Sequence, residues 1–209
     1  MSVNSSNDTA DDADSNTSSD DGTEYLDTER SSKRLRAQLI KGLERSTFDK
    51  TPSKFLPAGI LNHIITDSVI KTALRINRPT QEESNLVNFI RTRAPKAFAI
   101  TISERLNANK VMRWFHASGL DDTDLPITHE RDPWTRSWCD DFREEQWKFL
   151  APVFSTTEYS HDLEEGDVLP FISKASEVRQ GSFGAVYRYK VHKDHFSPVS
   201  YDQETSNRR

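Results

Sequence analysis

The sequence has few of the residues that cross-link small folds or span membranes. Its 209 residues include one cysteine, Cys139, which excludes an internal disulfide framework and a zinc site built on several thiolates. Only 7 residues are glycine and 34% are hydrophobic, so the chain is polar for its length and part of it should lie outside any core. The longest uncharged stretch, near residues 55–66, is about 12 residues long and contains Asn62 and His63, which makes it too short and too polar to cross a bilayer.

The N-terminus also lacks an apolar segment of the kind that directs secretion. Together with the single cysteine, which fits a reducing compartment, this predicts an intracellular protein, cytoplasmic or nuclear. Cys139 itself is expected to be a small, partly buried side chain beside Trp138. The basic cluster Lys33, Arg34 and Arg36 is either a nuclear import signal or the solvated face of a helix.

Positive charge is not concentrated in any large part of the chain. The net charge is −5, and residues 1–30 carry nine acidic side chains and one basic one, a net charge of −8. The rest of the chain has a net charge of only +3. Because a nucleic-acid-binding body needs a concentrated basic face, the sequence argues against nucleic acid as a partner.

Composition divides the chain into three parts. Residues 1–30 are rich in Asp, Ser, Asn and Thr and have little to bury, which predicts a disordered acidic tail. Residues 31–155 show helical periodicity and are expected to form an all-α domain of five or six short helices. Residues 163–209 lack that periodicity. The predicted fold class is therefore mainly α with a small C-terminal β-hairpin.

Local signals place several helix ends. Leu35, Leu39, Ile40 and Leu43 form one apolar stripe of a helix expected to start at Ser31, and a second helix is expected from Leu61 to the break at Arg78-Pro79. The next helix is expected to open on a capping box formed by Thr80 and Glu83. Further expected positions are Pro95 in a first turn, Asn107 as an N-cap and Gly119 as a C-terminal stop.

Three other patterns have simple structural explanations. The run from Asp121 to Pro126 resembles a calcium loop only in its acidity and is expected to be a solvated loop. Trp134, Trp138, Phe142 and Trp147 recur at helical spacing and predict a packing stripe. His192 and His195 have no third ligand nearby in the sequence, so we expect two exposed histidines and no metal site.

Residues 171–178 and 185–193 have the composition of strands and are joined by the glycine-containing connection 179–184. A dinucleotide-binding loop would be followed by a helix, and a Walker loop needs Gly-Lys-Ser/Thr, so both are excluded. In the second strand, Tyr187, Tyr189 and Val191 should share one face, with Val186, Arg188 and Lys190 on the other.

The string Gly181-Ser-Phe-Gly-Ala-Val-Tyr187 resembles the glycine-rich loop of eukaryotic protein kinases. The resemblance implies ATP as the cofactor. Backbone amides near Gly181, Ser182 and Gly184 would approach the phosphates, Phe183 would cover the tip, and Val178 and Val186 would enclose the adenine. Arg179 stands where that family's pattern has its first glycine. The alternative is an ordinary hairpin.

A wider likeness covers roughly residues 33–196. Gln146-Trp-Lys-Phe-Leu-Ala-Pro-Val-Phe154, then Leu169-Pro-Phe171, and finally Val191-His-Lys-Asp-His195 resemble filamentous-fungal protein-kinase-like proteins. In those proteins a helical N-terminal region precedes a kinase domain. The resemblance implies that residues 163–209 are the first two strands of a kinase N-lobe.

The sequence lacks the groups that perform phosphoryl transfer in that family. There is no Val-Ala-Ile-Lys strand, no His-Arg-Asp loop and no Asp-Phe-Gly, so no catalytic residue can be named and Mg²⁺ binding is not supported. The sequence therefore predicts the N-terminal fragment of a serine/threonine-type protein-kinase-like protein that is inactive by itself. The alternative is a non-catalytic helical module that binds a protein partner.

Overall fold

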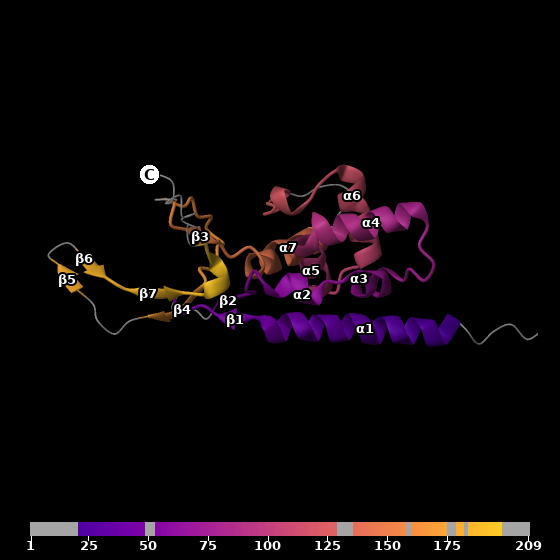
Figure 1. Ribbon diagram of the computed structural model, residues 1–209, viewed down its shortest axis with the longest axis horizontal. Helices are drawn as coiled ribbons and strands as arrows, with labels where there is room; N and C mark the ends of the chain where they lie inside the picture. Colours follow the sequence, from indigo (N-terminus) through magenta and orange to yellow (C-terminus); the bar gives the residue numbers. More distant parts are fainter. Residues whose placement is uncertain are drawn as a thin grey trace, which may run out of the picture.

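The computed structural model describes residues 21–48, 53–128, 136–157, 160–174, 179–181 and 184–197. Figure 1 shows a group of helices at one end and a thin β-ribbon extending from the other. The helices in chain order are α1 (Asp21–Gly42), α2 (Ile60–Ile64), α3 (Asp67–Leu74), α4 (Gln81–Thr92), α5 (Pro95–Ser103), α6 (Ala108–Ser118) and α7 (Arg136–Glu145). We call these helices the helical region; mainly-α character is thus confirmed.

Helix α1 is longer than its sequence predicts. It begins at Asp21, ten residues before the expected start at Ser31, so residues 21–30 are helical and the predicted tail boundary at residue 30 is wrong. The prediction failed because these residues are polar and helix periodicity is read from apolar positions. Residues 1–20 lie outside the described residues. Leu35 and Leu39 of the expected stripe are buried, whereas Ile40 is 41% exposed.

The single helix expected from Leu61 onward is in fact two. Helix α2 ends at Ile64, and α3 begins after Thr66, whose hydroxyl accepts a hydrogen bond from the Val69 amide. Helix α3 then ends at Leu74, before the predicted break, because Arg75 adopts a left-handed conformation with φ of 60°. Thr66-Asp67 is an N-cap signal that the apolar periodicity across it concealed.

The remaining predicted helix ends are confirmed. The Thr80 hydroxyl accepts from the Glu83 amide at 3.2 Å, and the Thr80 amide donates to the Glu83 carboxylate at 2.9 Å, which completes the capping box of α4. Pro95 is in the first turn of α5. Asn107 caps α6 by accepting from Lys110, and Gly119 ends α6 with φ of 69°.

The sequence predicts that the acidic loop after α6 is solvated, but in the structure part of this loop caps a helix. Asp122, in the short 3₁₀ helix η1 (Asp122–Asp124), accepts from the amides of Lys96 and Ala97 at 2.8 and 2.9 Å and so caps α5. Burial raises the pKa of Asp122 to about 6, although those amides favour the charged form. Its neighbour Asp121 accepts from Thr123 and Arg93, and these bonds lower its pKa to about 2.

One large core lies among the helices. Its fully buried side chains come from six helices and include Leu39, Ile70, Leu74, Leu86, Ile90, Phe98, Ile100, Met112, Phe115 and Phe142. In the predicted aromatic stripe, Phe142 and Cys139 are fully buried while Trp138 and Trp147 are half-buried. Trp134 lies outside the described residues. Burial of Cys139 goes further than the partial burial expected from the sequence.

Within the described residues, the strands form four separate pairs. Two were not anticipated: β1 (Glu44–Arg45) pairs antiparallel with β2 (Lys54–Phe55), and β3 (Phe154–Ser155) pairs parallel with β8 (Phe196–Ser197). The predicted hairpin is present but divided. Its outer pair is β5 (Arg179–Gly181) with β6 (Gly184–Val186), and its inner pair is β4 (Phe171–Lys174) with β7 (Tyr189–Val191). We call β4 to β7 the ribbon.

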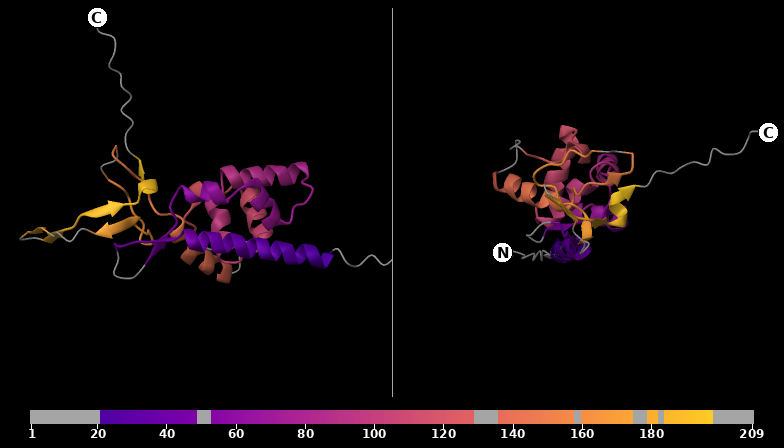
Figure 2. Two further views of the ribbon diagram at one scale, coloured as in Figure 1. Left: turned by 60° about the horizontal axis from the view of Figure 1, so that its bottom comes forward. Right: turned by 90° about the vertical axis from the view of Figure 1, so that its left-hand side faces the viewer.

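Figure 2 shows the β5–β6 pair at the far end of the ribbon, away from the helices. The connection expected at 179–184 is tighter than predicted, because residues 179–181 and 184 are themselves paired. Within the described residues, no helix combines the length and the apolar character needed to cross a bilayer.

Candidate functional site

The glycine motif occupies the tip of the ribbon. Gly181 pairs with Gly184, Gln180 with Ala185 and Arg179 with Val186, so β5 and β6 run antiparallel and the glycine pair lies at the end of both strands. Glycine has no side chain, so neither Gly181 nor Gly184 places a Cβ atom over the backbone at the end of these strands. A phosphate group could therefore approach the main chain there without meeting a Cβ atom.

The structure places only part of the predicted nucleotide site. Gly181, Gly184 and Val186 lie on the paired strands, and the Val186 side chain is 69% exposed. Val178, Ser182 and Phe183 lie outside the described residues, so their predicted roles over adenine and phosphate stay predictions. Arg179, which replaces the family's first glycine, is in strand β5 opposite Val186.

Aromatic rings cover the base of the ribbon. Phe171 and Tyr189 stack with ring centroids 5.0 Å apart, and Phe154 stacks on Phe171 at 5.9 Å. Phe48 approaches both Phe171 and Tyr189. The ammonium group of Lys174 lies 3.5 Å from the centre of the Tyr187 ring. These contacts hold β4 and β7 together despite the shift in register between Phe171 and Ser173.

The two histidines are buried, which contradicts the prediction that both are exposed. His192 is 7% exposed and His195 is 1% exposed. Both pack edge-on against Phe55, with ring centroids 5.9 and 5.2 Å away. The prediction failed because their partner lies more than 130 residues earlier in the chain. We call His192, His195 and Phe55 the histidine clamp.

The histidine clamp fixes the end of the ribbon to the helical region. The Ala58 amide donates to Nε2 of His195 at 3.1 Å, so the proton of the neutral ring is on Nδ1, which donates to the Pro152 carbonyl at 2.9 Å. Burial lowers the pKa of His195 below its usual value. His192 accepts from the Asp194 amide, and its Nε2 faces the Glu44 carboxylate at 3.3 Å.

The clamp has the geometry of a structural joint rather than a metal centre. Both ring nitrogens of His195 are used by backbone groups, which leaves none for a metal ion. Among the described residues, no group of three or more His, Cys, Asp or Glu side chains could hold a metal.

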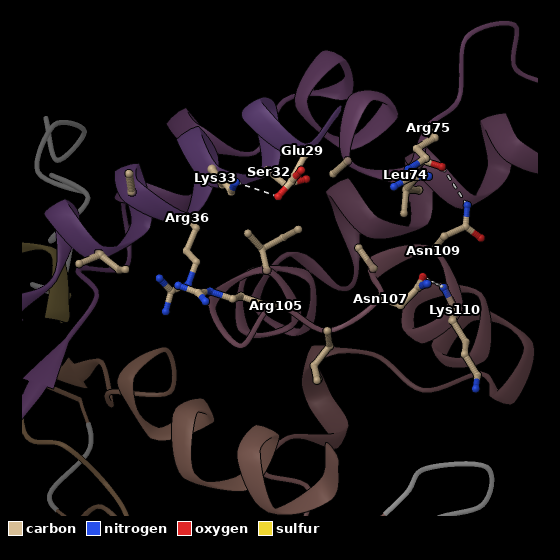
Figure 3. Close-up of a pocket in the computed structure, with 16 residues that line it drawn as sticks. Glu29, Ser32, Lys33, Arg36, Leu74, Arg75, Arg105, Asn107, Asn109 and Lys110 are labelled. Atoms are coloured by element: carbon tan, nitrogen blue, oxygen red, sulfur yellow. Dashed lines mark hydrogen bonds and ion pairs between the residues drawn. The ribbon is translucent and has the colours of Figure 1, made fainter. Parts of the chain in front are cut away.

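A second candidate site lies in the helical region, where sequence reasoning named nothing. A groove of about 1010 Å³ runs between α1, the C-terminal ends of α3 and α5, and the start of α6 (Figure 3). Its floor is apolar. Among the described residues that line it, the charged ones are the basic Lys33, Arg36, Arg75, Arg105 and Lys110 and the acidic Glu29. We call it the basic groove.

Several contacts shape the basic groove. Arg36 reaches across from α1 and donates to the Ser103 carbonyl at the end of α5, at 2.6 Å. Asn109 donates to the Leu74 carbonyl and so ties α6 to α3. Sequence reasoning missed the groove because its residues come from three separate stretches of the chain, 29–40, 73–75 and 102–110, and the Lys33–Arg36 cluster was the sole local indication.

No family model, curated protein or solved structure matches the chain.

Proposed function

We propose that the chain is the N-terminal part of a serine/threonine-type protein-kinase-like protein, in which a helical domain carries the glycine-rich hairpin that covers ATP. The observation that carries the proposal is the antiparallel pairing of Gly181 with Gly184 at the end of the ribbon. This is the arrangement that a strand–glycine loop–strand cover over a nucleotide requires. An exposed Val186 beside the turn supplies an apolar surface of the kind that adenine contacts.

The proposal is tested by transplanting the ribbon. Residues 171–191 would replace the corresponding strand pair of a protein kinase of known activity, and the KM for ATP would be measured. We expect the chimera to bind ATP, and Gly184→Val in the chimera to raise KM at least about tenfold, because a β-branched side chain blocks the approach of phosphate to the backbone.

Arg179→Gly is the matched control, since it changes the same hairpin but restores the family pattern. It should leave KM unchanged or lower it. Equal KM values for the unmodified chimera and for Gly184→Val would identify an ordinary hairpin turn and would contradict the proposal.

By itself the chain should transfer no phosphate from ATP to casein-like or histone-like proteins. The sequence lacks the lysine, aspartate and asparagine that position ATP, metal and the attacking hydroxyl in this family. Radiolabelled phosphate in a substrate protein, abolished by Gly181→Val and Gly184→Val, would contradict this.

A second candidate function is a helical module that binds a protein partner. The basic groove favours it, because five basic side chains around an apolar floor form a surface that can receive an acidic segment. The two functions are compatible, since the ribbon and the groove share no residues.

A further inference from the structure

The basic groove has a strong excess of positive charge. Among the described residues, five basic side chains line it, and the one acidic side chain, Glu29, is paired with Lys33 at 2.8 Å. Its volume of about 1010 Å³ is at the upper end of the range for small-molecule pockets, which suits a peptide segment. The groove is therefore shaped and charged for an extended acidic chain.

Two of the arginines stand where the backbone favours other residues. Arg75 and Arg105 have φ of 60° and 56°, in the left-handed region where glycine and asparagine are usual. A cation after a helix interacts well with the helix dipole, and both residues follow helices. The strain points to a role for these two side chains in the groove that both line.

The chain itself contains a segment of opposite charge. Residues 1–20 carry five aspartates, Asp8, Asp11, Asp12, Asp14 and Asp20, and no lysine or arginine. This segment joins α1 at Asp21, and α1 supplies the groove residues from Glu29 to Ile40. The acidic segment is thus attached directly to the helix that forms one wall of the groove.

Residues 1–20 are long enough to reach the basic groove. At about 1.5 Å per residue, the groove residues of α1 lie about 12 to 28 Å from the start of the helix. An extended chain spans about 3.3 Å per residue, so residues 1–20 reach about 66 Å. The segment can therefore reverse direction and run the full length of the groove.

We propose that the basic groove is a docking site for an acidic peptide segment and that residues 1–20 of the same chain are its occupant. Attachment at Asp21 gives this segment an effective concentration on the order of millimolar, which an acidic partner in solution would have to exceed.

The test is paramagnetic broadening in the full chain. A nitroxide is attached at Ser15→Cys, with Cys139→Ala to remove the buried native thiol. Amide intensities are measured at Lys33, Arg105 and Lys110 and compared with Tyr189 on the ribbon. We expect broadening by about twofold or more at the groove amides and none at Tyr189, with recovery in about 1 M NaCl, where the Debye length is about 3 Å.

The matched variants remove two charges each. Arg75→Asn with Arg105→Asn neutralises the groove, and asparagine tolerates the left-handed backbone. Arg34→Gln with Arg78→Gln removes two exposed charges that do not line the groove. Broadening should disappear in the first pair and persist in the second.

Three results would overturn the proposal. Groove amides that are never broadened, or that stay broadened at high salt or without Arg75 and Arg105, would exclude charge-driven docking. Broadening of an isotope-labelled chain by a separate spin-labelled chain mixed with it would assign the occupant to a second copy. Groove amides that shift with an added acidic peptide, but show no broadening from residue 15, would assign it to a separate partner. The salt series on the unsubstituted groove decides the question even if a variant fails to fold.

Discussion

The helical region and the ribbon are stabilised in different ways. The helices share one core in which side chains from α1 and α3 to α7 are fully buried, and four of the helices have well-defined caps. Among its described residues, the ribbon has no such core. It relies on stacked aromatic rings and on a small cluster of Phe55, Ala151 and Val168 where it meets the helices. An isolated two-stranded hairpin is marginal in water, so the ribbon depends on its attachment, whereas the helical region does not depend on the ribbon.

The largest expected effect comes from the core of the helical region. Phe98 is fully buried, and Phe98→Ala should lower the free energy of unfolding by about 3–5 kcal/mol because it leaves a cavity. Urea unfolding followed by circular dichroism at 222 nm measures the change. Tyr187→Ala on the ribbon, where the ring is 44% exposed, is the control and should leave the helical transition in place. Similar losses for both would mean that the two regions unfold as one unit.

A smaller effect is expected at the histidine clamp. His195→Ala removes the acceptor of the Ala58 amide and the donor to the Pro152 carbonyl, which should weaken ribbon attachment by about 1–3 kcal/mol. Hydrogen exchange should speed up at the amides of β4 and β7 and remain slow in α4 to α6. His63→Asn, at an exposed histidine of α2, is the control. Faster exchange throughout the helices would show that the clamp stabilises the whole chain.

Acidification from pH 7 to 5 should act in opposite directions on the two regions. His195 has a lowered pKa, so the unfolded chain takes up its proton first and ribbon attachment weakens as the pH falls below about 6.5. Asp122 has a pKa raised to about 6, so the folded helical region binds a proton more tightly than the unfolded chain. Its free energy of unfolding should therefore rise by about 1 kcal/mol by pH 5.

Burial and the neighbouring Glu145 carboxylate also raise the pKa of Glu104, which acts in the same direction as Asp122. Asp121, with a pKa near 2, has no effect in this range. Hydrogen exchange and urea unfolding at pH 7, 6 and 5 separate the two responses. In Asp122→Asn the gain in the helical region should be smaller, and a parallel decline of both regions would contradict the assignment.

The smallest effect is expected at the surface of the ribbon. Lys174→Gln removes an ammonium group from the face of the Tyr187 ring and should weaken the β4–β7 pairing by about 0.5 kcal/mol. Amide exchange at Tyr189 measures this. Lys190→Gln, an exposed lysine on the opposite face, is the matched control and should have no measurable effect.

The features that could be predicted from the sequence are helix ends whose signals lie within a few residues of each other. Thr80 with Glu83, and Asn107 with Gly119, are complete signals within a few residues, and each helix end was found where expected. The break at Thr66 was missed because the apolar spacing of the two flanking helices happens to be continuous across it. The early start of α1 was missed because a polar helix carries no apolar period.

The candidate sites also differ in whether their residues are close together in the sequence, which decides whether the sequence could predict them. The glycine hairpin was recognisable because its residues are consecutive, and Gly181 and Gly184 lie opposite each other as such a loop needs. The burial of His195 depends on Ala58 and Pro152, and the basic groove depends on three separate stretches of the chain. No pattern within a short stretch of sequence predicts these contacts, because they form only when distant elements pack against each other.

The short parallel pair of β3 and β8 has a consequence for how the molecule can change. Phe154 lies beside Phe196 and Ser155 beside Ser197, so the segment that contains the ribbon leaves and re-enters the fold at one place. A segment whose two ends are adjacent behaves as an insertion, and its length can vary at an entropic cost that grows only slowly. We therefore expect that the ribbon can be lengthened, shortened or replaced while β3 and β8 still pair and hold its two ends beside the helical region.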